Sequence, residues 1–98
     1  MQEILRGVRG FEWDDGNSGK NEKKHGVTDR EAEEIFFNKP LLIGRSTKGG
    51  SEARYAALGK TLGSRLLTVV FTLRSRRIRV ISARPMSRRE RETYEKED

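Results

Sequence analysis

The chain has 98 residues, of which 33% are hydrophobic and 37% charged, and its formal net charge is +6. This length supports a single domain over residues 1–98, in which we expect residues 1–9 to form a leader segment and residues 95–98 a frayed tail. The absence of cysteine excludes disulfides and cysteine metal sites, and no apolar run approaches the roughly 20 residues that cross a membrane. We therefore expect a cytoplasmic protein with no membrane partner.

Positive charge is concentrated in the second part of the chain. Residues 1–40 contain seven Lys/Arg and nine Asp/Glu, whereas residues 41–98 contain fourteen and six. Eight arginines fall between positions 74 and 91. Guanidinium groups match phosphate oxygens with paired hydrogen bonds and also stack on bases. This part of the chain indicates a surface for a polyanion, RNA first, although a solvated strand face and helix face would have the same composition.

The N-terminal part of the sequence predicts one short strand and two helices. Residues 10–13 are the opening strand, and Asp14 is a candidate N-cap for a weak polar helix that runs to Lys24, before Gly26. Residues 28–31 form a capping box, which begins a second short helix that residues 38–40 end. The apolar stripe of this second helix consists of Ala32, Ile35 and Phe36.

The pattern then changes to that of strands, which we expect at residues 41–43, 54–60, 66–73 and 76–84. A polar loop over residues 45–51 joins the first two, and residues 62–65 and 74–75 form turns. The third strand is apolar on both faces and is therefore central. In the fourth, Ile78 and Val80 point one way and Arg77 and Arg79 the other, which leaves one sheet face partly basic and open. A second capping box at residues 87–90 begins a last helix.

These elements predict an α+β fold. Its parts are a short N-terminal strand, two N-terminal helices, an antiparallel four-stranded meander sheet and a C-terminal helix.

Several separated segments resemble one known family. They are Phe11-x-Trp13-Asp14, Asn21-x-x-Lys24-His25-Gly26-Val27, Glu52-x-Arg54-Tyr55, Leu58-Gly59, Arg65-Leu66-Leu67-x-Val69-Val70, Arg79-x-Ile81-Ser82-Ala83-Arg84, Arg88-Arg89-Glu90-Arg91 and Tyr94-Glu95. In this order they resemble the BrnT toxin family over nearly the whole chain. The chain departs from that family at Asn17, where many members have a lysine, and so has one positive charge fewer on the predicted first helix.

The resemblance implies a RelE-like fold and the activity of a ribonuclease toxin from a type II toxin–antitoxin pair. It also implies a protein partner, a BrnA-like antitoxin whose own domain binds DNA and represses the operon. RNA is the expected substrate, and the chain would inhibit translation when it is free.

RNA cleavage through the 2′-hydroxyl needs a proton acceptor, a proton donor and cations around the phosphate, but neither metal nor cofactor. The candidate catalytic residues are His25, Arg79, Arg84 and Tyr94. The candidate RNA-binding residues are Lys24, Arg54, Arg65, Arg77 and Arg88.

Structural roles compete with several of these assignments. Lys24, His25 and Gly26 are also an ordinary helix ending, Arg84 could cap the last strand, and Tyr94 could pack against the sheet or contact the antitoxin. The whole protein could likewise be a non-catalytic module that binds nucleic acid or forms complexes, or a purely structural partner.

Overall fold

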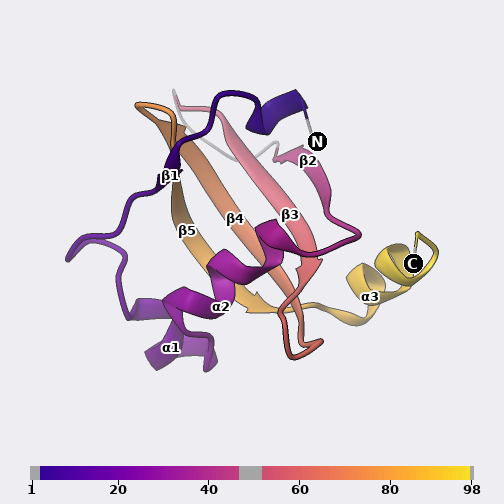
Figure 1. Ribbon diagram of the computed structural model, residues 1–98. Helices are drawn as coiled ribbons and strands as arrows, with labels where there is room; N and C mark the ends of the chain where they lie inside the picture. Colours follow the sequence, from indigo (N-terminus) through magenta and orange to yellow (C-terminus); the bar gives the residue numbers. More distant parts are fainter. Residues whose placement is uncertain (1–2, 47–51, 98) are drawn as a thin grey trace.

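The computed structural model describes residues 3–46 and 52–97, and it confirms the predicted α+β class (Figure 1). The described elements are η1 (Glu3–Leu5), β1 (Gly10–Phe11), α1 (Lys20–His25), α2 (Asp29–Glu34), η2 (Ile35–Phe37), β2 (Leu42–Ser46), β3 (Arg54–Lys60), β4 (Leu66–Arg74), β5 (Arg77–Pro85) and α3 (Arg88–Glu95). The sheet has the order β1-β5-β4-β3-β2. Strands β2 to β5 form an antiparallel meander, and β1 pairs in parallel with the outer edge of β5.

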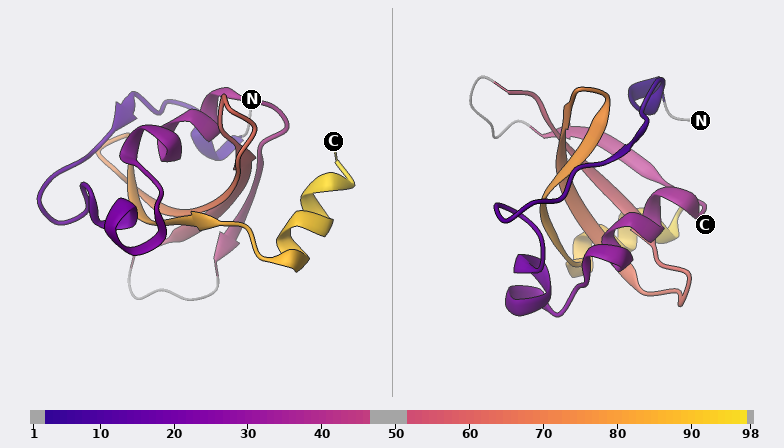
Figure 2. Two further views of the ribbon diagram at one scale, coloured as in Figure 1. Left: turned by 90° about the horizontal axis from the view of Figure 1, so that it is seen from below. Right: turned by 60° about the vertical axis from the view of Figure 1, so that its left-hand side comes forward.

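The core lies between the sheet and the segment formed by α2 and η2, which sits within the curve of the sheet (Figure 2). Leu67, Val69 and Phe71 of the central strand β4 are fully buried on this side, as expected for alternate residues of one strand face. Ile35 of η2 packs against β3 at Gly59, where an added Cβ would lie 2.9 Å from the Cβ of Ile35. The missing side chain at Gly59 therefore allows η2 to lie close to the sheet.

The first helix is shorter than predicted, and Asp14 is not its N-cap. Residues 15–19 form turns, and α1 begins after Gly19, which supplies no side-chain cap. The Asp14 carboxylate instead accepts a hydrogen bond from the Gly16 backbone N–H at 2.8 Å. Two glycines before Lys20 lower the helix propensity of this stretch, which favours turns. The predicted helix end is confirmed, because Gly26 adopts a left-handed conformation with φ of 68°.

Asn17 lies buried in the turn before α1, so the expectation that it stands on the first helix is wrong. Its amide donates to the carbonyl oxygens of Glu12 at 3.0 Å and Val80 at 3.1 Å. Buried Asn21 accepts from the Ala83 N–H at 3.0 Å. Strand β1 pairs only with the first residues of β5. The two asparagines provide hydrogen-bond partners for backbone groups farther along the same edge of β5.

The remaining elements agree with the sequence apart from shifts at their ends. Both predicted capping boxes are present, with Thr28 and Ser87 as the N-caps. Strand β2 extends to Ser46, into the stretch predicted as a loop, and residues 47–51 of that loop lie outside the described part of the chain. The β4–β5 turn is Ser75–Arg76, with φ of 50° and 65°, and both positive values suit the right-handed twist of a tight hairpin. Within residues 3–46 and 52–97, no helix combines the length and apolarity needed to cross a bilayer.

Candidate functional site

One face of the sheet carries most of the candidate cations. Arg74 pairs with Arg77 across β4 and β5, Thr72 pairs with Arg79, and Thr68 pairs with Arg84. In β4, Thr68, Thr72 and Arg74 alternate with the core residues Leu67, Val69 and Phe71. They and their cross-strand partners in β5 therefore occupy the side of the sheet turned away from α2. Arg54 of β3 precedes the core-facing Tyr55 and belongs to the same side. We call this side, with Arg54, Arg74, Arg77, Arg79 and Arg84, the arginine face.

Arg79 is on this face as predicted, but it is not open to solvent. Its guanidinium lies 3.0 Å from a carboxylate oxygen of Glu12, and it donates two hydrogen bonds to Asp14 at 2.9 and 3.0 Å. Only 15% of the Arg79 side chain is exposed. The hydrogen bonds from Arg79 and from the Gly16 backbone lower the pKa of Asp14, so this carboxylate is ionised at neutral pH. The Arg79 guanidinium, expected on an open sheet face, is therefore paired with the carboxylates of Glu12 and Asp14.

A second ion pair lies close to the first on the arginine face. Arg74 binds both carboxylate oxygens of Glu52 at 2.9 and 3.2 Å, which lowers the pKa of Glu52. Arg54 and Arg79 add a further electrostatic contribution to the same carboxylate. The Arg54 Nε atom is buried and has no hydrogen-bond partner among the described residues. We call Glu12, Asp14, Glu52, Arg54, Arg74 and Arg79 together the charged cluster.

Arg84 lies near the other end of β5 and holds the last helix. Its guanidinium donates to both oxygens of Glu90 in α3, at 2.8 and 3.0 Å. Glu90 also accepts from the Thr68 hydroxyl at 2.8 Å and from the Ser87 backbone N–H at 2.8 Å. The hydrogen bonds from Arg84 are the largest contribution, and the pKa of Glu90 falls to about 2. The geometry supports the structural alternative for Arg84, since its fork is already engaged.

Tyr94 is a buried residue of α3, with 1% of its surface exposed. Its hydroxyl donates to the Pro40 carbonyl oxygen at 2.6 Å. This contact ties α3 to the segment that precedes β2. RNA would reach the phenol only if α3 moved, so the position favours the packing role considered for Tyr94.

The first helix places its candidates apart from the charged cluster. Lys24 and His25 are the last two residues of α1, with Lys24 exposed and His25 half-buried. Arg65 lies beside this helix end, where it donates to the Gly26 carbonyl oxygen at 2.8 Å and to Glu31 at 3.1 Å. The described contacts therefore join Arg65 to the end of α1, and they do not connect His25 to Arg79.

Arg77 and Arg88 are, like Lys24, exposed candidates. Arg77 is exposed at the beginning of β5, and Arg88 is exposed at the beginning of α3, where it pairs with Glu92 at 3.6 Å. An exposed pair at this distance contributes little to stability, so both guanidinium groups are available to a ligand.

The carboxylates are the part of the site that sequence reasoning missed. Asp14 lies 65 positions from Arg79, and no local pattern joins them. The nearest signal was the acidic pair of residues 14–15 directly after the opening strand, opposite a strand with alternating arginines. Among the described residues, no group of three or more His, Cys, Asp and Glu side chains is placed to hold a metal ion.

Comparison with known proteins adds evidence on the family of this chain. No curated protein matches the chain. One family model matches residues 13–90, and it describes the ribonuclease toxin BrnT of type II toxin–antitoxin systems. The matched part contains all five residues of the arginine face, together with Asp14 and Glu90. Because the match covers well over half of the sequence, the chain belongs to the BrnT family of ribonuclease toxins of type II toxin–antitoxin systems.

Proposed function

We propose that this toxin is an endoribonuclease that cleaves RNA on the arginine face without a metal ion and thereby inhibits translation. One observation carries the proposal: five arginines share the sheet face that α2 does not cover. Three of them, Arg54, Arg74 and Arg79, belong to one charged cluster. We adopt the RelE-like assignment implied by the sequence resemblance together with this proposal.

The chemistry proposed is transfer of the phosphate to the neighbouring 2′-hydroxyl. A base takes the 2′-hydroxyl proton, the 2′-oxygen attacks the phosphorus, and the 5′-oxygen leaves with a proton. The products are a 2′,3′-cyclic phosphate and a 5′-hydroxyl end. Guanidinium groups held in place by the sheet stabilise the additional negative charge of the transition state. We assign this role to Arg54 and Arg79.

We propose His25 and Tyr94 as the proton carriers. His25 is the only histidine of the chain, and imidazole can both accept and donate a proton. Lys24, Arg65, Arg77 and Arg88 would bind flanking phosphates rather than the scissile one. Tyr94 would act only from a conformation in which α3 has moved.

The same proposal includes a BrnA-like antitoxin as the protein partner. In the bound state its DNA-binding domain would repress the operon, and the toxin would be held inactive. The positive charge of residues 41–98 suits a partner that carries carboxylates.

One observation favours a second candidate, a non-catalytic module that binds nucleic acid or forms complexes. The arginines of the charged cluster are balanced by three carboxylates, which oppose the approach of phosphate. Such a module would bind RNA with a strong salt dependence and leave it intact.

The deciding experiment is cleavage of a single-stranded RNA by the purified toxin in the presence of EDTA. We expect cleavage with 2′,3′-cyclic phosphate ends, and a rate about 100-fold lower for Arg79→Ala. Arg79→Lys keeps the charge but not the fork, and Arg30→Ala removes an exposed arginine of α2 as the control. Binding without cleavage would select the second candidate.

A matched pair of variants tests whether carboxylates restrain the arginine face. Asp14→Asn and Asp15→Asn each remove one negative charge, but only Asp14 pairs with Arg79. We expect Asp14→Asn to tighten RNA binding several-fold more than Asp15→Asn does at low salt. Equal effects would mean that only net charge matters.

A further inference from the structure

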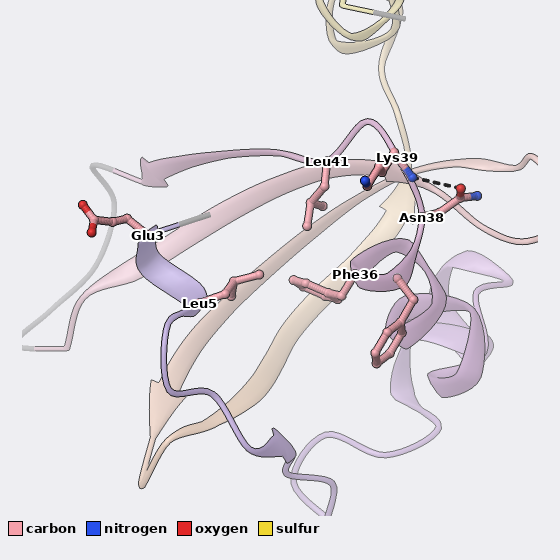
Figure 3. A pocket seen from close by; sticks show the side chains of 7 residues that line it. Glu3, Leu5, Phe36, Asn38, Lys39 and Leu41 are labelled. Atoms are coloured by element: carbon pink, nitrogen blue, oxygen red, sulfur yellow. Dashed lines mark hydrogen bonds between the residues drawn. The ribbon is translucent and has the colours of Figure 1, made fainter. Parts of the chain in front are cut away.

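An apolar groove lies between the N-terminal segment and η2 (Figure 3). Leu5, Phe36 and Leu41 point toward one another from three different segments, and Phe37 completes the apolar lining. The hollow has a volume of about 660 Å³. A smaller hollow of about 280 Å³ shares Leu5, Phe36 and Phe37 and continues along Val8 and Phe11. The two together form one groove, which we call the phenylalanine groove.

Phe37 is unusually exposed for its size. Its side chain is 77% accessible, the most of the large hydrophobic residues that the structure describes as exposed. The ring adjoins other aromatic side chains, because its centroid lies 6.2 Å from that of Phe11, which in turn packs edge-on against Phe36 at 5.6 Å. An exposed aromatic ring beside an apolar hollow is typical of an anchor for a protein partner.

The charges around the groove are predominantly positive. Lys39 is exposed at one end and Arg9 at the other, and both line the groove. Among the described residues of the lining, the one carboxylate is that of Glu3, which lies 3.7 Å from the exposed Arg6. A partner segment with apolar side chains bordered by carboxylates therefore complements this surface.

We propose that the phenylalanine groove is where the antitoxin docks on this toxin, through an apolar segment flanked by acidic residues. The inference rests on the antitoxin part of the proposed function and not on its RNA chemistry. RNA does not suit the groove, because apolar side chains form most of its lining and its cations, Lys39 and Arg9, lie at opposite ends. A second copy of the toxin does not suit it either, because each copy would bring the same positive rim.

The groove is also separate from the arginine face. Its residues belong to η1, the segment that leads into β1, η2, the segment before β2 and the core-facing side of β5 at Ile78. They lie on the side of the sheet that holds α2 and the core, whereas the arginines point to the other side. Docking and cleavage can consequently be changed independently, which gives the test its controls.

The test measures binding of the toxin to the protein encoded by the adjacent reading frame, purified separately and titrated by calorimetry. Phe37→Ser should weaken binding at least tenfold, and Lys39→Glu should weaken it and reduce its salt dependence. Leu62→Ser is the matched control, because Leu62 is also a large apolar residue, 68% exposed, but lies in the β3–β4 turn. Arg30→Glu is the matched control for charge, and neither control should change affinity by more than twofold.

Three outcomes would overturn the inference. The first is that Phe37→Ser and Lys39→Glu bind the adjacent protein as tightly as the parent, or that the parent does not bind it at all. The second is that Phe37→Ser converts a dimeric toxin to a monomer in sedimentation, which would mean that the groove binds a second copy of the toxin. The third is that both controls weaken binding as much as the groove variants.

RNA cleavage measured without the adjacent protein keeps the two proposals apart. Parent and Phe37→Ser should cleave at equal rates if both proposals hold. A toxin that cleaves no RNA would refute the ribonuclease proposal, while the binding measurements would still decide the docking surface.

Discussion

Replacing Glu90 by Gln tests how α3 is held against the sheet. Glutamine keeps the capping box with Ser87, since Gln is accepted at that position, but it removes the charge that Arg84 binds at 2.8 and 3.0 Å. A pKa of about 2 in place of 4.5, at about 1.4 kcal/mol for each pKa unit, sets an upper limit of about 3 kcal/mol at pH 7. Solvent screening reduces this figure, because 26% of the Glu90 side chain and 37% of the Arg84 side chain are exposed. We therefore expect Glu90→Gln to lower the free energy of unfolding by about 1–2 kcal/mol.

The dependence on pH identifies the charge as the cause. Because folding lowers the pKa of Glu90, its contribution is complete above the ordinary value of 4.5 and is lost as the pH falls toward 2. Urea unfolding of parent and variant at several pH values between 7 and 2 should show the difference shrinking below pH 4.5. The control is Glu92→Gln, which removes a carboxylate from an exposed pair on the same helix and should cost less than 0.5 kcal/mol. A loss for Glu90→Gln that stays constant from pH 7 to pH 2 would refute the assignment.

Two further substitutions test packing and the strand edge. Gly59→Ala should destabilise the protein by about 1–3 kcal/mol in thermal unfolding, because the new methyl group would lie 2.9 Å from the Cβ of Ile35. The control is Gly63→Ala, whose methyl group would lie 3.8 Å from its nearest neighbour. Asn21→Ala should cost about 1–3 kcal/mol by leaving the Ala83 N–H without its buried partner, and hydrogen exchange at Ala83 should accelerate. Unchanged exchange at that amide would contradict the role given to Asn21.

The sequence predicted the elements that local patterns determine. The capping boxes at Thr28 and Ser87 fixed where two helices begin, and the apolar run around Val69 and Phe71 identified the central strand. Both signals depend on residues at most a few positions apart. The α+β class followed from the order of these elements, and the resemblance to the BrnT family was confirmed over residues 13–90.

The parts that failed depend on contacts between distant segments. The residues next to Asp14 in the sequence suggest that it is an N-cap, and only the folded sheet brings Arg79 to within 2.9 Å of it. Asn17 looks like a surface residue until the edge of β5 supplies a carbonyl group for its amide. Alternation placed Arg79 on the correct face of β5, but alternation says nothing about which carboxylates cover that face. The catalytic and RNA-binding roles of the candidate residues stay predictions.

The parallel pairing of β1 with β5 determines how much of the chain must be synthesised before the sheet is complete. The first strand of the sheet has no partner until the last strand has been made, since Gly10 pairs with Arg77 and Phe11 with Ile78. The ion pairs between Asp14 and Arg79 close over the same long separation, and contacts of this kind form late in folding. A nascent chain that ends before β5 therefore has neither a completed sheet edge nor the charged cluster. The hollow beside Phe11 depends on the same strand, because Ile78 of β5 also lines it, so neither surface is complete before β5 has left the ribosome.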